Sequence, residues 1–432
     1  MKNRRFLQFC AALTLAAALE GASPSAAQLL PGGLPGTLGR VVGPPVENTL
    51  NSAGALPQSA VRELEQVRRD TLQSLRRQHG DVIDIDPHGD AIVRSEVIAI
   101  APSAAALAAA EAQGFTETQR LDPNALGVSF VVLHAPRGMS TRRALDHLRR
   151  LDPQGAYDFN HLYLPSGDAS AASAPAAQVE PPAPNARVGM IDSGVDANHP
   201  DLAGARITQR GFTQADARAT EHGTAVASLI AGAHGAAPGA SLFVADVYGA
   251  DPAGGGAAAI IAAFGWLAEA HTPVVNVSLV GPDNRALEAA VHALTARGVL
   301  VVAAVGNDGP NAPPLYPAAY PGVIGVTGVD ARNRALPEAE RGAQVAFAAP
   351  GMIRAAALNG RSADVRGTSF AAPIVAGLLA RRMGAPDPAA AQQARADLAR
   401  SALDLGARGP DPVFGAGLVG GALRTPERVA QH

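Results

Sequence analysis

Residues 187–425 predict a doubly wound α/β domain whose sheet is mostly parallel and carries helices on both faces. One observation is a series of near-continuous Val, Ile and Ala runs, which are typical of strands buried on both faces. The other is that helical stretches divide these runs. The expected strands are 187–191, 241–247, 274–279, 299–305, 323–329 and 345–348, and the expected helices are 222–233, 256–270, 285–297, 370–383 and 389–403.

A small α+β unit is expected ahead of this domain, over residues 91–164. Two β-like runs are each followed by a helical stretch, and an extended piece closes the unit. The order is close to the ferredoxin-like β-α-β-β-α-β plan. The expected elements are 92–100, 103–113, 128–133, 140–151 and 157–164.

The N-terminus has the pattern of an export signal over residues 1–27. Basic residues precede an apolar run, 6–19, which is too short to be a permanent membrane span. The small residues 25–27 fit the cleavage pattern of a signal peptide. We therefore expect a secreted or periplasmic protein. The single cysteine, Cys10, lies inside the signal, so the exported chain should form no disulfide.

Residues 28–90 are expected to form a flexible leader followed by a helix over 59–78, where apolar residues share one helical stripe. The acidic cluster at 81–90 fits no ion-binding loop, and a solvated turn is the better interpretation. Residues 165–186 are rich in Pro, Ala and Ser, which predicts a linker that is open to proteolysis. Residues 426–432 are expected to be a tail.

Charge and hydropathy argue against nucleic acid as a partner and against a stable membrane span. The chain has 432 residues and a net charge of −3, so it offers no basic surface for nucleic acid. Beyond the signal, no segment is long and apolar enough to suggest a stable membrane span.

Three short motifs carry the candidate chemistry. Ser369, in Gly-Thr-Ser-Phe-Ala-Ala-Pro, stands at the expected start of a helix, where free N–H groups and the dipole stabilise an oxyanion. A serine hydroxyl needs a base with a pKa near the working pH, and His222 supplies an imidazole. Asp192, at the end of an expected strand, would fix the tautomer of that imidazole. Each residue alone could be a helix cap or an Asx-turn, but the set in the order Asp, His, Ser indicates a catalytic triad.

These motifs resemble those of the subtilisin-like serine proteases, the subtilases, over roughly residues 185–425. The resemblance implies a subtilisin-like fold and an endopeptidase that forms an acyl-enzyme at Ser369. It also implies that Asn307, in Val-Gly-Asn-Asp-Gly, donates its side-chain amide to the oxyanion beside the N–H of Ser369.

The small unit is similar to the propeptide domain that precedes subtilase catalytic domains. Its segment Phe-Asn-His-Leu-Tyr, residues 159–163, resembles the closing strand of that domain. The resemblance implies that this unit is an intramolecular chaperone and inhibitor, and that protein or peptide substrates are the other partners.

The family's substrate-binding edge strand is similar to residues 278–281, where a bound peptide would add as an extra strand. Val280 occupies a position where the family often has Gly, and Leu315 falls near the floor of the first specificity pocket. We expect a shallow pocket. The substrate-binding residues implied are Ser278, Leu279, Val280, Gly281, Gly306 and Leu315.

No cofactor and no metal ligand are predicted, and calcium stays open as an alternative implied by the resemblance. Calcium is bound by many subtilisins through a loop that interrupts the helix after the His-Gly-Thr motif. Here the chain runs directly from Ile230 to Pro238 without such an insertion. His199, in Asn-His-Pro-Asp-Leu, matches a family motif that is structural.

Self-processing would require a cut between the unit and the catalytic domain. We expect it between Leu164 and Ala177, after a small or medium apolar residue, because proline nitrogens farther along disfavour cleavage. Two alternatives stay open. One is a non-catalytic subtilase-fold binding or adhesin protein, and the other is a maturation protease of narrow specificity.

Overall fold

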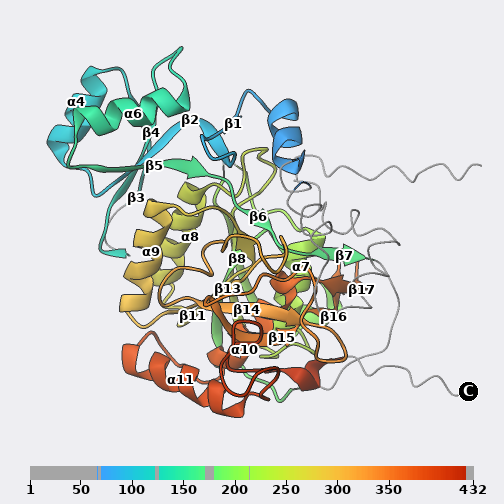
Figure 1. The fold of residues 1–432 in the computed structure, drawn as a ribbon. Coiled ribbons are helices and arrows are strands. Elements are labelled where there is room, and N and C mark those ends of the chain that lie inside the picture. Colours follow the sequence, from blue (N-terminus) through green and yellow to red (C-terminus); the bar gives the residue numbers. More distant parts are fainter. Residues whose placement is uncertain (1–65, 67–69, 122–125, 171–179, 214, 425–432) are drawn as a thin grey trace, which may run out of the picture.

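The computed structural model describes residues 66, 70–121, 126–170, 180–213 and 215–424 (Figure 1). The expected signal peptide with Cys10, most of the leader and the tail at 426–432 lie outside the described residues.

A seven-stranded sheet forms the centre of the larger domain, and every pair of neighbouring strands is parallel. The predicted doubly wound α/β fold is confirmed. In spatial order the strands are β15 (Val345–Pro350), β14 (Ile324–Val329), β13 (Leu300–Ala304), β11 (Val274–Val277), β8 (Arg187–Asp192), β10 (Ser241–Asp246) and β9 (Arg206–Gly211).

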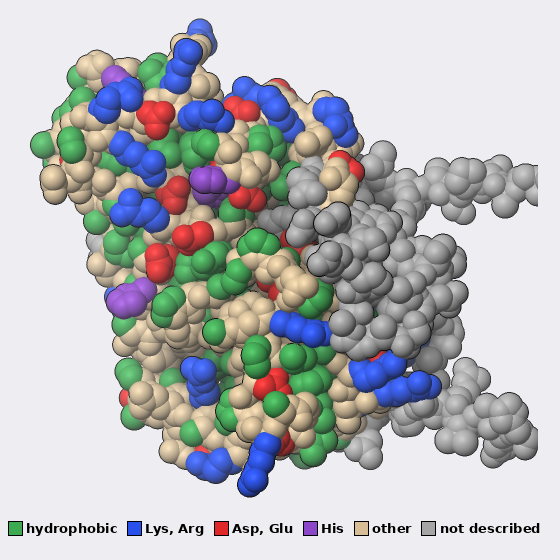
Figure 2. Space-filling model, viewed as in Figure 1, with side chains coloured by type: hydrophobic (Ala, Val, Ile, Leu, Met, Phe, Trp, Pro, Cys, Tyr) green, Lys and Arg blue, Asp and Glu red, His purple; other side chains and the backbone are tan. Residues whose placement is uncertain are grey.

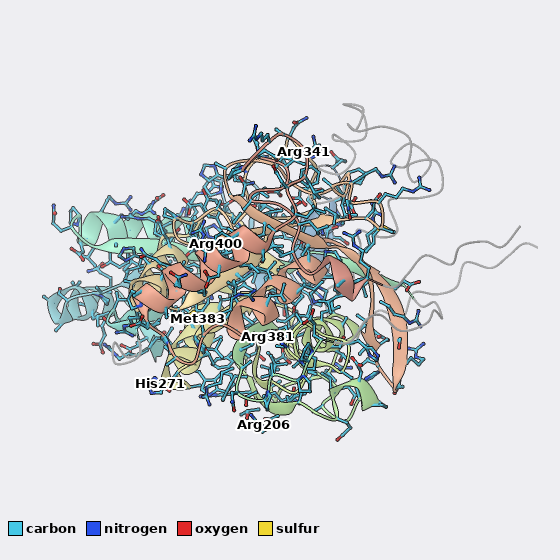
Figure 3. The ribbon with its side chains drawn as sticks, turned by 90° about the horizontal axis from the view of Figure 1, so that it is seen from below. Arg206, His271, Arg341, Arg381, Met383 and Arg400 are labelled. Atoms are coloured by element: carbon cyan, nitrogen blue, oxygen red, sulfur yellow. The ribbon has the colours of Figure 1, made fainter. Side chains whose placement is uncertain are left out.

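Helices cover both faces of this sheet (Figure 1). One face packs on α8 (Ala257–Glu269) and α9 (Arg285–Ala296), and the other packs on α7 (Glu221–Ala231), α10 (Thr368–Ala380) and α11 (Pro388–Ser401). Figure 3 shows this face from below, with Arg400 on α11 and Met383 shortly after the end of α10. Side chains of β8 alternate between the two cores, because Met190 packs with α7, α10 and α11, whereas Ile191 packs with α8 and α9.

Three strands of the larger domain were not expected from the sequence: β9, β16 (Met352–Ala357) and β17 (Arg361–Arg366). β9 is the edge of the main sheet and is mostly exposed, so its sequence has no apolar run. β16 and β17 form an antiparallel hairpin outside the main sheet, and β17 carries charged residues on its exposed side. Polar or partly exposed strands of this kind lack the pattern that identifies strands buried on both faces.

The N-terminal unit is an antiparallel α+β sheet, as expected. Its third strand, β3, was not expected because it is a polar edge strand. Residues 70–78 are helical, and Leu72 and Leu75 are buried against the unit. The elements are β1 (Ile83–Ile85), β2 (Ala91–Ile100), α4 (Ala104–Ala112), β3 (Thr116–Leu121), β4 (Phe130–His134), α6 (Thr141–Leu151) and β5 (Ala156–His161).

The unit lies over the N-terminal ends of α8 and α9 (Figure 1). Asn160 accepts a hydrogen bond from the N–H of Ala258 at 3.0 Å, where α8 has no cap from its own Gly256. Asp158 accepts from the N–H of Arg285 at 2.8 Å, at the start of α9. Polar side chains on β5 therefore satisfy helix N–H groups that have no partner within the helices.

The acidic turn at 81–90 differs from the expectation in one respect. Asp86 is buried rather than solvated, and its carboxylate accepts from the N–H groups of His88 and Asp90. Burial opposes ionisation, but hydrogen bonds from His161 and these backbone groups lower the pKa of Asp86. The ring of His161 in turn contacts Asn284, so the turn is part of the contact between the two units.

Basic and acidic side chains are interspersed on the face shown in Figure 2. Within the described residues, no helix has the length and apolar character that a membrane crossing needs.

We predict that Glu96→Gln stabilises the chain at neutral pH. Burial raises the pKa of Glu96, so the ionised form is less stable folded than unfolded, although Asn160 donates to it at 2.7 Å. The stability lost as pH rises through the raised pKa should return when glutamine removes the charge. The expected result is a higher melting temperature at pH 7.5 and no gain at pH 4.

Glu117→Gln, at an exposed position on β3, is the matched control. Both variants are to be compared in a Ser369→Ala background, so that self-cleavage does not intervene. A lower melting temperature of Glu96→Gln at pH 7.5 would contradict the prediction.

Candidate active site

Ser369 is the second residue of α10, which begins after Gly367. The first N–H groups of a helix have no partner within it. The N–H of Ser369 instead donates to the carbonyl oxygen of Ser166 at 3.0 Å. A residue 203 positions earlier in the chain thus lies at the start of this helix.

Asp192 ends β8 and is fully buried, beside the start of α7. One carboxylate oxygen lies 2.8 Å from Nδ1 of His222 and also accepts from the backbone and hydroxyl of Ser193. Thr220 caps α7 by accepting from the N–H of Gly223. The carboxylate and the helix together fix the ring. A carboxylate beside Nδ1 favours the tautomer with the proton on Nδ1, which leaves Nε2 able to accept a proton.

The hydroxyl of Ser369 lies between two backbone groups. It donates to the carbonyl oxygen of Ser278 at 3.0 Å and accepts from the N–H of Ser166 at 3.0 Å. Nε2 of His222 is buried and has no hydrogen-bond partner among the described residues. The structure therefore joins Asp192 to His222, while the hydroxyl is turned to Ser278.

Asn307 follows β13 and is 3% exposed. Its Oδ1 accepts from the N–H of Thr368 at 3.2 Å, which turns Nδ2 the other way. A Cβ on Gly367 would lie 2.9 Å from Nδ2 of Asn307 and 3.0 Å from the carbonyl oxygen of Ser166. The amide nitrogen of Asn307 and the carbonyl oxygen of Ser166 thus border the same small space. An oxyanion at this oxygen would have two donors nearby, the N–H of Ser369 and the amide of Asn307.

The expected substrate-binding strand is paired with the chain itself. β12 (Leu279–Val280) is antiparallel to β6 (Leu164–Pro165), with Leu279 opposite Pro165 and Val280 opposite Leu164. After Ser166 and Gly167, β7 (Asp168–Ser170) pairs with β17 (Figure 1). The start of the segment expected to be a linker therefore runs as strand on both sides of Ser166.

Tyr163 anchors this segment. Its side chain is fully buried, and its hydroxyl donates to the carbonyl oxygen of Pro282 at 2.8 Å. A Cβ on Gly281 would lie 2.5 Å from the ring, so glycine is needed there. Tyr248 donates to the carbonyl oxygen of Tyr163 at 2.9 Å. Burial, with the charges of Asp192 and Asp246, raises the pKa of Tyr248 well above its ordinary value, which keeps it a donor.

Val280 and Leu315 are both buried and belong to one cluster of packed side chains. Behind them lies Glu340, which is fully buried and accepts from the N–H of Leu315 at 3.2 Å. Gly306, at φ +118°, has no room for a Cβ, which would lie 2.3 Å from the Glu340 carboxylate. Glu340 and Leu315 therefore pack closely around Gly306.

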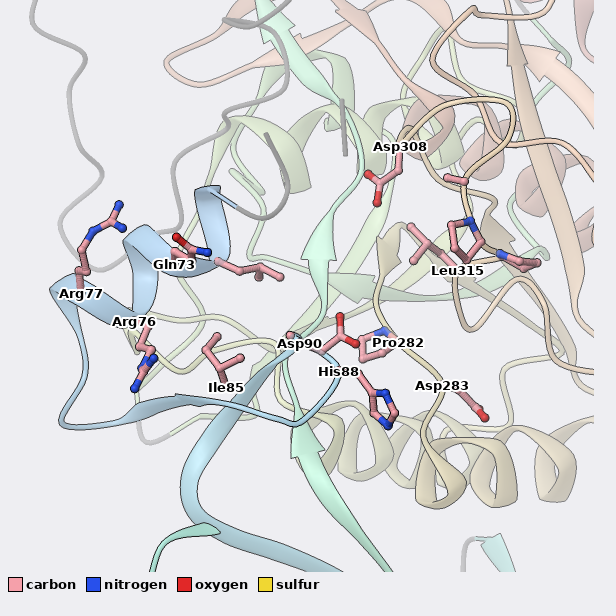
Figure 4. A pocket seen from close by; sticks show the side chains of 15 residues that line it. Gln73, Arg76, Arg77, Ile85, His88, Asp90, Pro282, Asp283, Asp308 and Leu315 are labelled. Atoms are coloured by element: carbon pink, nitrogen blue, oxygen red, sulfur yellow. The ribbon is translucent and has the colours of Figure 1, made fainter. Parts of the chain in front are cut away.

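A cavity of about 840 Å³ opens beside this region (Figure 4). Leu315, Asp308 and Pro282 form one wall, and Arg76 and His88 of the N-terminal unit contribute to the other. The cavity thus lies between the two units.

Several residues that shape the site were not found from the sequence. Phe370 packs its ring on His222 with centroids 5.2 Å apart, and Thr368 lies 3.2 Å, hydroxyl to hydroxyl, from Ser166. Both flank Ser369, so adjacency in the motif was an available signal. No sequence signal identified Glu340, because it comes from a polar loop that is distant in the chain.

The remaining expected residues are placed as follows. His199 caps a short helix by accepting from the N–H of Asp201, and its other nitrogen contacts the carbonyl of Arg361. After α7 the residues 232–237 are Gly, Ala and His, which offer no carboxylate for calcium. In the described part of the chain, no group of three His, Cys, Asp or Glu side chains has the arrangement of a metal site.

Comparison with known proteins gives the same assignment as the motifs. Residues 184–417 match the model of the Subtilase family. Subtilisin DY of Bacillus licheniformis is 33% identical over 234 residues, which cover 51% of this chain and 85% of that protein. The minor extracellular protease Epr of Bacillus subtilis (strain 168) is 38% identical over 157 residues, 36% of this chain but only 24% of that protein.

Among solved structures, fervidolysin from Fervidobacterium pennivorans, a keratinolytic enzyme related to subtilisin, shares the fold. Its TM-score is 0.66 at 20% identity, covering 80% of this chain and 63% of that chain. The family model spans more than half of the 432 residues. The chain therefore belongs to the subtilase family of serine proteases.

Proposed function

We propose that this subtilase is an exported serine endopeptidase, made as a precursor that cuts its own chain between Ser166 and Gly167. The observation that carries the proposal is the hydrogen bond from the N–H of Ser369 to the carbonyl oxygen of Ser166. A carbonyl held by a helix N-terminus beside a serine hydroxyl is in the position of a scissile carbonyl. The bond lies within the range 164–177 expected from the sequence.

The proposed reaction uses the groups that surround this bond. The hydroxyl oxygen of Ser369 attacks the carbonyl carbon of Ser166 and gives its proton to Nε2 of His222, while Asp192 stabilises the imidazolium. The oxyanion is held by the N–H of Ser369 and the amide of Asn307. The C–N bond then breaks, and His222 returns the proton to the nitrogen of Gly167. Water releases the acyl group by the same route in reverse.

The N-terminal unit has the contacts of an inhibitor and folding aid. It caps α8 and α9 through Asn160 and Asp158, and Tyr163 fixes the register of the strand that fills the cleft. Export is supported by the pattern of residues 1–27 and by the extracellular location in the name of the relative Epr.

We predict that Ser369→Ala abolishes both self-processing and hydrolysis of casein, because one nucleophile serves both. The purified variant should remain a full-length precursor, whereas the wild type should give a mature chain that begins at Gly167 by N-terminal sequencing. Ser362→Ala, exposed on β17, is the control and should process normally. Mature-sized protein from pure Ser369→Ala would refute the proposal, and a terminus before residue 150 would refute the removal of the unit.

We predict that Asn307→Ala slows self-processing and casein hydrolysis by about 10²–10³-fold, the loss measured for one oxyanion donor in a subtilisin. The melting temperature should change little, because among the described residues the side chain makes one hydrogen bond, accepted from the N–H of Thr368. Asn198→Ala, at an exposed position, serves as the control. Wild-type rates in Asn307→Ala would remove this residue from the oxyanion hole.

A further inference from the structure

Gly167, the residue after the proposed cut, lies in a space that admits no side chain. Its φ is +147°, in a region that favours glycine. A Cβ there would lie 2.7 Å from Cε2 of Phe370 and 2.9 Å from the carbonyl oxygen of Arg366. Both distances are shorter than any ordinary carbon contact. These close contacts are with a backbone oxygen and a ring carbon. A Cβ has a fixed position on the backbone, so no side-chain rotation of a residue in place of Gly167 would relieve the clash.

The wall that excludes a side chain is firmly held. Phe370 is fully buried in α10, and its ring packs on the ring of His222. A retreat of Phe370 would therefore disturb the base. The other wall, the carbonyl of Arg366, belongs to β17, which pairs with β16 and with β7. The guanidinium of Arg366 is held by Glu338 through two contacts of 2.7 and 2.8 Å.

Gly367, which follows Arg366, also lies very close to Gly167. A Cβ on Gly367 would lie 2.6 Å from the α-carbon of Gly167. Two glycines therefore pass each other at backbone distance, and Gly367 also leaves room for the carbonyl oxygen of Ser166. On the other side of the cut, Ser166 is 1% exposed and its hydroxyl lies 3.2 Å from that of Thr368.

From these contacts we infer that the enzyme selects glycine immediately after the cleaved bond, with Phe370 as the specificity-determining residue. Its substrates would be protein segments in which a small residue precedes glycine, as Ser166 precedes Gly167. The inference rests on the proposed endopeptidase function and names the substrate class of the same site. An alanine in place of the glycine would have to displace Phe370 or the strand β17.

The test uses the self-processed enzyme and two internally quenched peptides. One has the sequence of residues 160–170, and the other has alanine in place of glycine 167. We expect kcat/KM to fall by about 10–200-fold for the alanine peptide, the range for one methyl group in a close-fitting site. Phe370→Leu should reduce this ratio toward one, whereas Phe264→Leu, equally buried on α8, should preserve it.

A digest of denatured casein distinguishes a failure of this inference from a failure of the proposed function. Wild-type enzyme should cut casein, and sequencing of the new N-termini should show glycine enriched at the first position. Casein cleavage without that enrichment, or equal rates on the two peptides, would overturn glycine selection and leave the protease intact. No cleavage of casein or of either peptide would overturn both. If Phe370→Leu does not fold, the wild-type peptide ratio and the casein products still decide.

Discussion

The hydrogen bond between the N–H of Ser369 and the carbonyl oxygen of Ser166 is the contact on which the rest of the site depends. It exists because α10 begins one residue before Ser369, which leaves that N–H without a helical partner. Once Ser166 is held there, Leu164 and Pro165 align with β12, and residues 168–170 align with β17. One helix start thus sets the register of strands on both sides.

Docking of the N-terminal unit and placement of the cleft segment are parts of one arrangement. β5, which caps α8 and α9 through Asn160 and Asp158, leads directly into Tyr163 and β6. Only a few residues separate the caps from Ser166, so the chain has little freedom to shift along the cleft. Helix caps contribute about 0.5–2 kcal/mol each, and here they also fix which bond faces Ser369.

The sequence was sufficient to predict the strands that are buried on both faces, but not the polar or partly exposed strands around them. Val- and Ile-rich runs identified β8, β11 and β14 because both faces of those strands are buried. β9 was not predicted because it is a polar edge strand. β17 was not predicted because it is polar and partly exposed, and β6 and β7 were not predicted because proline- and serine-rich sequence carries no strand pattern. The motifs around Asp192, His222 and Ser369 were readable as short segments. Glu340 and the fit of Gly167 against Phe370 arise only from contacts between distant segments.

The orientation of the Ser369 hydroxyl separates binding of the cleft segment from its cleavage. The hydroxyl donates to Ser278, on the strand that holds the segment, while Nε2 of His222 is left without a partner among the described residues. Transfer of the proton to His222 requires the hydroxyl to leave Ser278, and a rotation about χ1 is a small motion between staggered wells. The N–H of Ser166 would then lose its acceptor on Ser369. In the proposed reaction, the same serine therefore holds the segment with its hydroxyl in one rotamer and would attack it from another.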